Sequence, residues 1–313
     1  MPFQIITGTF HVVGYSPDGD SIRFAADDVA KLFDLDGAEP RVNARGHTQL
    51  RFEGIDSLET HFSPANGGTL HQPLAFATQA TDLLLQYLGI TNVVWNASRT
   101  TVASASDGTR GFILSRSVEK NGRPVAFVYL GDPPAADGTS FRLEAPYLRG
   151  SYNHRVLLEG LAYATYYWGL FSDLRDELTA AVTSARADRR GLYGNDVTNE
   201  GFEIATITDL TDTHVMMPKL FRRLSEYFAS TGSIVDFKRT LEASQEPVLE
   251  IATANFTHFD TFVEQAAGSN RIRLTARPEQ LVFDPMPLRP TNTFALVVEH
   301  EEELALERML ADR

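Results

Sequence analysis

Short apolar runs alternate with turn-forming strings through the first 130 residues, which is the pattern of a β-rich region. Residues 3–15 and 21–26 flank the string SPDGD, so they predict a β-hairpin. A third strand is predicted at residues 48–55. Further strands are expected at residues 92–98, 109–117 and 124–130. An Asn-Gly turn precedes the last of them, so that strand is expected to belong to a second hairpin.

Helical spacing of apolar residues appears between and after these strands. Residues 73–89 predict a helix that ends at Gly89, and residues 172–191 predict a second helix with Ser172 as its N-cap. Residues 25–47 form a polar insertion with one expected helical turn. Together these elements predict an α+β fold in which an OB-fold five-stranded β-barrel carries helices.

The chain divides into two expected domains, a barrel at residues 1–196 and a smaller C-terminal α+β domain of unknown role at residues 197–313. We expect the first to fold alone. The C-terminal domain is predicted to contain helices at 216–230, 256–267 and 301–313, and strands at 247–256, 271–276 and 294–300. Arg222 and Arg223 can form a basic spot, but their position on the solvated face of their helix is the favoured expectation.

Composition narrows the possible chemistry. The 313 residues are 43% hydrophobic and 22% charged, as in a globular protein, and include no cysteine. Disulfides, thiolate metal sites and cysteine nucleophiles are therefore excluded. No apolar run approaches the roughly 18 residues of a membrane helix, and no signal peptide is recognisable, so we expect a cytoplasmic protein without membrane contact.

The net charge of −13 argues against a passive nucleic-acid coat protein, which would carry a basic surface. Residues 201–313 hold 11 basic and 18 acidic side chains, so the acidic excess is densest there. An enzyme that handles phosphate esters with a few placed arginines remains compatible with this balance.

Three short strings carry the candidate chemistry: PDGDSI at 17–22, RFEGIDSLET at 51–60 and EKNGRPVAF at 119–127. Each alone is typical of a turn or an edge strand with solvated charges. In this order, with helices after the second and third strings, they resemble the staphylococcal nuclease family over about residues 8–195. The resemblance implies a Ca²⁺-dependent endonuclease that hydrolyses DNA or RNA, cleaves the 5′-O–P bond and leaves 3′-phosphate ends.

The resemblance also implies roles for individual residues. It implies that Asp20 and Asp56 are Ca²⁺ ligands, with the backbone carbonyl of Ser57 beside them. It implies that Glu59 orients or deprotonates the attacking water. It implies that Arg51 and Arg123 clamp the phosphate.

These residue types suit phosphodiester hydrolysis. Guanidinium forks bind the non-bridging oxygens bidentately as negative charge develops on them, and Ca²⁺ takes carboxylate oxygens as ligands. A nearby carboxylate can position or deprotonate a water. Arg51 and Asp56 are five residues apart, which places them on opposite faces of a regular strand. We therefore expect a bend or bulge between them, with Gly54 as the candidate.

The family pattern is not complete. Leu58 stands where many members have proline, and Asn121 stands where a stacking tyrosine is often found. Three later tyrosines are weaker substrate-binding candidates: Tyr163, Tyr166 and Tyr167. They can stack on a nucleotide base or form an aromatic wall that packs the barrel.

Two other functions compete with the nuclease. One is a non-catalytic, nuclease-like binding module. The other is a nuclease effector governed by the C-terminal domain, through which a protein partner or self-association would act. Retention of all five charged side chains favours catalysis, and DNA or RNA is the expected partner.

Overall fold

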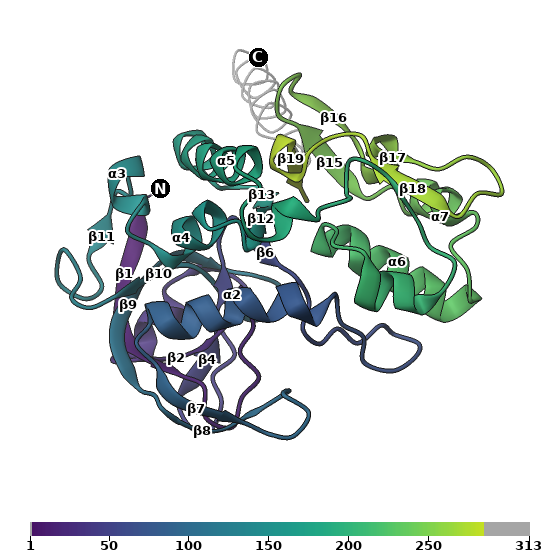
Figure 1. Ribbon diagram of the computed structural model, residues 1–313. Helices are drawn as coiled ribbons and strands as arrows, with labels where there is room; N and C mark the ends of the chain where they lie inside the picture. Colours follow the sequence, from purple (N-terminus) through teal and green to yellow (C-terminus); the bar gives the residue numbers. More distant parts are fainter. Residues whose placement is uncertain (1, 285–313) are drawn as a thin grey trace, which may run out of the picture.

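The computed structural model describes residues 2–284, and it is an α+β structure (Figure 1). Residues 2–196, the N-terminal unit, contain a strongly curled sheet with helices. Residues 197–284, the C-terminal unit, lie beside it at the right of Figure 1. No helix within residues 2–284 is long and apolar enough to cross a bilayer.

The curled sheet is the centre of the N-terminal unit. Its strands are β1 (Phe3–His11), β2 (Arg23–Ala26), β3 (Asp36–Gly37), β4 (His47–Gln49), β5 (Arg51–Phe52), β9 (Thr109–Val118), β10 (Pro124–Leu130) and β11 (Ser140–Phe141). The order is β4-β2-β1-β9-β10-β5, with β11 beside β1 and β3 beside β9. The β1–β2 hairpin and the strands at β9 and β10 confirm the sequence expectations.

Consecutive apolar residues in β9 show why this sheet holds together. Phe112, Ile113 and Leu114 are all buried although neighbouring side chains point to opposite faces of a strand. Both faces of the sheet are therefore covered here. Asn153 fixes two of its strands, because it accepts from the N–H of Val128 at 3.0 Å and donates to the carbonyl of Glu53 at 2.9 Å.

Helices pack around the sheet in the N-terminal unit: α1 (Ala30–Phe33), α2 (Leu74–Tyr87), α3 (Ala145–Leu148), α4 (Tyr152–Leu158) and α5 (Ser172–Ala187). The helix expected at 73–89 is confirmed, and Gly89 follows it with a φ of 66°. The helix at 172–191 is also present, but Ser172 is its first residue and its side chain caps nothing.

Smaller strand pairs complete the N-terminal unit. They are β6 (Ile55–Ser57) with β12 (Ala162–Ala164), and the hairpin of β7 (Thr91–Trp95) and β8 (Val102–Ser106). Strand β8 was not predicted from the sequence. Strand β13 (Tyr166–Tyr167) pairs instead with the C-terminal unit.

The C-terminal unit contains two helices and six short strands within the described residues. They are β14 (Phe202–Glu203), α6 (Pro218–Thr231), α7 (Phe237–Ser244), β15 (Pro247–Glu250), β16 (Asn255–His258), β17 (Val263–Glu264), β18 (Arg271–Leu274) and β19 (Leu281–Phe283). The helix expected at 216–230 and the strand at 271–276 are confirmed.

Two other expectations for this unit are wrong. The strand expected at 247–256 is interrupted by a turn, and β15 and β16 form a hairpin. The helix expected at 256–267 is β16, one 3₁₀ turn and β17. Phe259 and Phe262 are three residues apart and both buried, which a single 3₁₀ turn achieves without a longer helix. The elements expected at 294–300 and 301–313 lie outside the described residues.

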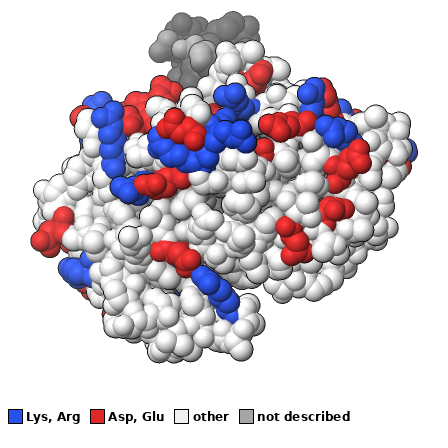
Figure 2. Space-filling model, in the orientation of Figure 1, with Lys and Arg blue, Asp and Glu red and all other residues white. Residues whose placement is uncertain are grey.

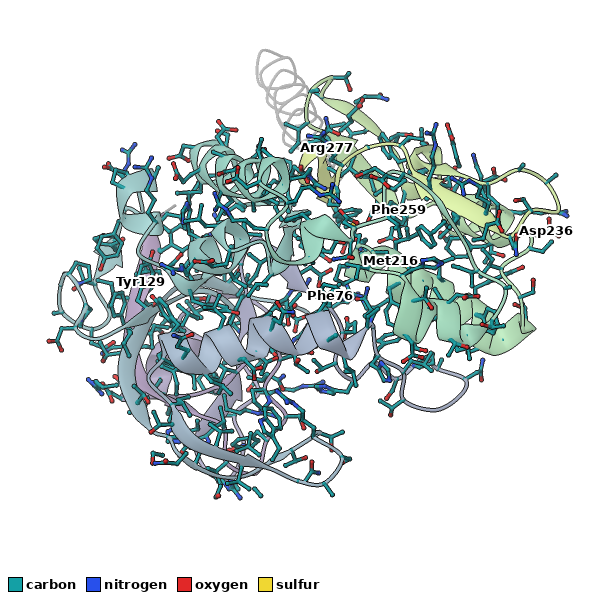
Figure 3. All side chains as sticks on the ribbon, viewed as in Figure 1. Phe76, Tyr129, Met216, Asp236, Phe259 and Arg277 are labelled. Atoms are coloured by element: carbon teal, nitrogen blue, oxygen red, sulfur yellow. The ribbon has the colours of Figure 1, made fainter. Side chains whose placement is uncertain are left out.

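The two units share a sheet and a core. The four-stranded sheet β13-β19-β15-β16 takes β13 from the N-terminal unit, with Tyr166 opposite Val282. Met216 lies between the units in Figure 3 and is fully buried, and Gln72 donates to its carbonyl at 2.8 Å. The expected boundary after residue 196 therefore separates two units that are closely packed.

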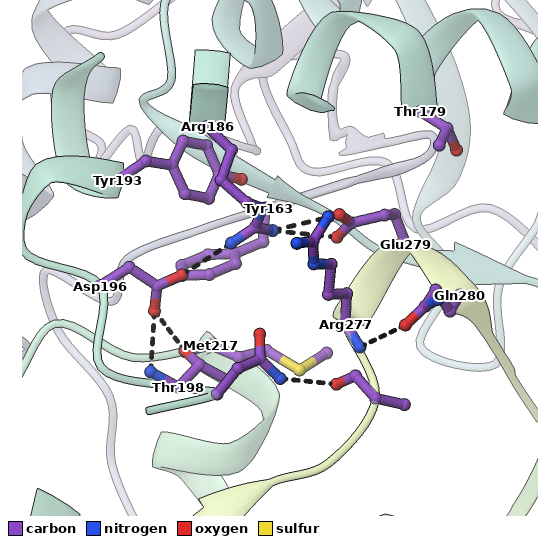
Figure 4. A network of polar contacts seen from close by, with 12 residues as sticks. Tyr163, Thr179, Arg186, Tyr193, Asp196, Thr198, Met217, Arg277, Glu279 and Gln280 are labelled. Carbon is purple, nitrogen blue, oxygen red and sulfur yellow. Dashed lines mark hydrogen bonds and ion pairs between the residues drawn. The ribbon is translucent and has the colours of Figure 1, made fainter. Parts of the chain in front are cut away.

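A polar network reinforces the junction (Figure 4). Arg186 of α5 forms ion pairs with Asp196 and with Glu279, both at 3.1 Å. Asp196 also accepts from the hydroxyl of Tyr163 at 2.9 Å. Thr198 bonds Asp196 and accepts from the N–H of Met217, the residue before α6, at 3.0 Å. The start of α6 is thereby held against the N-terminal unit.

Candidate functional site

A cleft of about 1270 Å³ lies between the two units. Strands β5 and β6, the loop before β10 and helix α6 line it. Six of the predicted site residues line this one cleft: Asp20, Arg51, Asp56, Glu59, Arg123 and Tyr167. Residues separated by more than 100 positions in the sequence thus meet at one place.

The two predicted phosphate-binding arginines lie at one pair of neighbouring strands. Arg51 in β5 lies opposite Val125 in β10, and these strands run parallel. Arg123 is in the turn directly before β10, two residues before Val125. Pairing of β5 with β10 therefore brings the segments that carry Arg51 and Arg123 together, and both side chains line the cleft.

The chain bends between β5 and β6, as expected at Gly54. This glycine has a φ of 75°, in the left-handed region that favours glycine. A Cβ atom there would lie 2.7 Å from Cδ1 of Leu178. The bend lets Arg51 and Asp56 line the same cleft, and the prediction is confirmed.

A tight turn positions Asp20. The N–H of Phe52 donates to the carbonyl of Asp20 at 2.9 Å, which holds the turn beside β5. Tyr152 of α4 is fully buried and donates its hydroxyl to the carbonyl of Gly19 at 2.8 Å. Backbone bonds between Asp18 and Ser21 close the turn.

Arg222 of helix α6 enters this site from the C-terminal unit. Its Nη1 and Nη2 donate to the two carboxylate oxygens of Asp56 at 3.1 and 2.7 Å. Nη1 also donates to Oε1 of Glu59 at 2.5 Å. The side chain is only 22% exposed. One guanidinium therefore bridges Asp56, which was predicted to bind Ca²⁺, and Glu59, which was predicted to act on the attacking water.

Arg51 is placed differently from Arg222. Its guanidinium carbon lies 4.6 Å from the centre of the Tyr167 ring, a cation–π contact. Within residues 2–284 it forms no ion pair. Arg123 donates from Nε to Glu119 at 3.0 Å and is 30% exposed. Both arginines retain N–H donors for a phosphate.

Burial and mutual repulsion dominate the electrostatics of the carboxylates. Burial raises the pKa of Asp20 to about 7, and the charges of Asp56 and Glu59 add to the rise. Burial also raises the pKa of Glu59, although Arg222 opposes this effect. The pKa of Asp18 is raised by burial and by the charges of Asp20 and Glu59. The acidic floor of the cleft therefore favours a nearby cation.

Lys219 adds a further positive charge beside Tyr167. Its Nζ lies 5.5 Å from the centre of that ring and 2.6 Å from Oε1 of Glu246. Burial raises the pKa of the Tyr167 hydroxyl, but Arg51 and Lys219 outweigh burial, so the net shift is downward. Trp168, 45% exposed, also lines the cleft and offers a second aromatic surface.

Two of the three predicted stacking tyrosines do not face the cleft. Tyr163 is fully buried and donates to Asp196. Tyr166 is fully buried and donates to the carbonyl of Arg175 at 3.0 Å. They form the aromatic wall that the sequence analysis gave as the alternative, and we no longer consider them stacking candidates. Tyr167 alone among the three lines the cleft.

The predicted Ca²⁺ ligands have suitable chemistry, but as arranged they do not fit the ion. Both oxygens of Asp56 already accept from Arg222. Ser57 is buried in the β6–β12 ladder and does not line the cleft. Within residues 2–284, no group of three or more His, Asp or Glu side chains has the arrangement of a metal site. Calcium would have to displace Arg222 before Asp56 could bind it.

The expectation that Arg222 and Arg223 lie on a solvated helix face is wrong. Both are partly buried and line the cleft, and Arg223 bonds Glu246 at 3.0 Å. A signal for this was present in the sequence. The cleft-lining residues of α6 recur at helical spacing: Lys219, Arg222, Arg223, Glu226, Tyr227 and Ser230. This polar stripe opposes the buried face with Leu220 and Leu224.

Charge on the molecular surface is mixed. On the face drawn in Figure 2, basic and acidic side chains are interspersed, and no continuous basic track crosses it.

Neither a scan against models of known protein families nor a search of curated proteins found a match for this chain.

Proposed function

We propose that this chain is a phosphodiester hydrolase that acts on nucleic acid, built on an OB-type barrel. The observation that supports the proposal best is the meeting of Arg51, Glu59 and Arg123 in one cleft, although they come from separate segments. The pairing of β5 with β10 brings the segments that carry Arg51 and Arg123 together, and the bend at Gly54 lies between Arg51 and Glu59.

The arrangement suits attack of water on phosphorus. Arg51 and Arg123 would bind the non-bridging oxygens and offset the charge that develops on them. Glu59 would take a proton from the water as the new P–O bond forms and the ester P–O bond breaks. The departing oxygen takes a proton from solvent water, and Glu59 then returns its proton to solvent, which yields an alcohol and a phosphate monoester.

Glu59 can act as the base while Arg222 holds it. Arg222 contacts only Oε1, and among the described residues Oε2 makes no hydrogen bond. The raised pKa of Glu59 makes its ionised form a stronger base. A contact on one oxygen therefore orients the carboxylate and leaves the other for water.

The proposal is tested by incubating the purified chain with plasmid DNA and with RNA, in parallel samples with Ca²⁺ and with EDTA. We expect cleavage, and a loss of about 100- to 1000-fold in rate for Arg51→Ala and Arg123→Ala, the cost of removing one donor to developing charge. Arg155→Ala is the control, because Arg155 is exposed on α4 and pairs only with Glu159. Equal rates in all three variants would refute the assignment.

The non-catalytic binding module remains the second candidate, because Arg222 already forms ion pairs with two of the carboxylates. Its signature is oligonucleotide binding that Arg51→Ala weakens, with no cleavage in either metal condition. That result would replace the hydrolase with the binding module.

A further inference from the structure

Helix α6 is firmly attached where it delivers Arg222. Of the residues just before it, Met216 accepts from Gln72 of the N-terminal unit, and Met217 donates to Thr198, which in turn bonds Asp196 of that unit. Within the helix, Phe221 is fully buried and its ring packs edge-on against Phe62 at 6.0 Å. Arg222 lies between these anchors and the cleft, so its contact with Asp56 is part of the packed junction.

The hydrogen bonds of Arg222 leave a particular pair of donors. A guanidinium has five N–H groups. Three are used: Nη1 bonds Asp56 and Glu59, and Nη2 bonds Asp56. The Nε–H and one Nη2–H remain, and they form the side edge of the guanidinium, which matches two oxygens of a phosphate.

The same guanidinium competes with a divalent cation. Calcium takes six to eight oxygen ligands, so carboxylates that already accept from arginine are poor ligands for it. Asp56 has both oxygens engaged, and Glu59 has one. Calcium that took both oxygens of Asp56 and Oε1 of Glu59 would compete with three charge-assisted hydrogen bonds and lie against the guanidinium charge.

We propose that Arg222 takes the place of a divalent cation in this site. It offsets part of the negative charge of Asp56 and Glu59 and, with Arg51, binds the phosphate group of the substrate. This proposal rests on the proposed function for the identity of the substrate. It makes anion binding, and the hydrolysis that follows, independent of calcium.

The first test measures calcium binding by isothermal titration calorimetry. Arg222→Gln frees the carboxylates, so we expect it to bind Ca²⁺ at least about tenfold more tightly than the wild-type chain, as expected from removal of a hydrogen bond to a charged group. Arg239→Gln is the matched control, because Arg239 is exposed on α7 and does not line the cleft. Circular dichroism checks that the variants are folded.

If Arg222→Gln does not fold, Arg222→Lys keeps one positive charge without the bidentate geometry, and we expect its Ca²⁺ affinity also to exceed that of the wild type. Wild-type binding as tight as that of the folded variant would overturn the proposal, because calcium would then coexist with Arg222 or displace it freely.

The second test measures binding of inorganic phosphate in EDTA. The wild-type chain and Arg239→Gln should bind it, and Arg222→Gln should bind at least about tenfold more weakly. Phosphate binding that appears only with Ca²⁺ would overturn the proposal. If both binding results are as expected and no ester is cleaved, the hydrolase proposal fails while the assignment of Arg222 as the resident cation stands.

Discussion

The two walls of the cleft are built in different ways. On the N-terminal side, Arg51 and Asp56 sit on strands, at positions set by a glycine bend and by strand register. On the C-terminal side, Lys219 and Arg222 project from one stripe of helix α6. The first wall depends on local chain geometry, whereas the second depends on how a helix docks. The site therefore belongs to both units.

The two walls also differ in the charged side chains that they bring to the site. The N-terminal wall carries Asp18, Asp20, Asp56 and Glu59, whose burial near one another is unfavourable without cations. The C-terminal wall supplies Lys219 and Arg222, although its unit is the more acidic part of the sequence. Local placement of a few side chains thus decides the field in the cleft.

Removal of the C-terminal unit, and with it one wall of the cleft, should have the largest effect on stability. We now expect a fragment of residues 1–196 to be strongly destabilised, because it exposes Tyr166, Tyr167 and Phe62, which pack against the C-terminal unit. Each large apolar side chain exposed costs about 1.5–3 kcal/mol. The free energy of unfolding in urea measures the effect.

A chain of residues 1–284 is the control for this truncation, because it retains β19 and every described contact. A 1–196 fragment as stable as that control would show that the N-terminal unit folds alone, as the sequence analysis expected. It would also show that the shared sheet contributes little to stability.

Substitutions of Tyr163 and Tyr167 should have smaller effects, on stability for Tyr163 and on substrate binding for Tyr167. Tyr163→Phe removes a buried hydrogen bond to Asp196, so it should cost about 1.5–3 kcal/mol of unfolding free energy and leave kcat/KM unchanged. Tyr167→Ala removes the ring beneath Arg51 in the cleft, so it should raise KM for an oligonucleotide. Urea unfolding and steady-state kinetics measure both variants. A change in kcat/KM for Tyr163→Phe would contradict the structural role.

The smallest predicted effect concerns how the free energy of unfolding depends on pH through Glu246, which pairs with the C-terminal wall of the cleft. Burial raises the pKa of Glu246, but Lys219 and Arg223 outweigh it and hold the pKa below its ordinary 4.5. A lowered folded-state pKa gives stability above pH 4.5 that is lost as the pH falls through the folded-state value. Glu246→Gln should therefore be less stable than wild type at neutral pH, and the difference should shrink in acid. A constant difference from neutral pH to about pH 3 would contradict this assignment.

Much of the N-terminal unit could be predicted because its signals are local. The hairpin around SPDGD, the helix ending near Gly89 and the bend at Gly54 each depend on residues close in sequence. The burial of Tyr163 could not be predicted in the same way. A cluster of tyrosines at 163, 166 and 167 fits a substrate surface and a packed wall equally well, and only burial distinguishes them.

The sequence by itself determined an α+β chain with short paired strands, because turn chemistry and apolar spacing act over a few residues. It also determined which arginines and carboxylates were candidates for the site. Tertiary structure alone decided that Arg222 meets Asp56 and Glu59, 166 and 163 positions away, and that β13 joins β19. A charged stripe on a helix is stable when it faces solvent and also when it faces opposite charges. Only the docking of the helix against the N-terminal unit determines which of these two environments the stripe has.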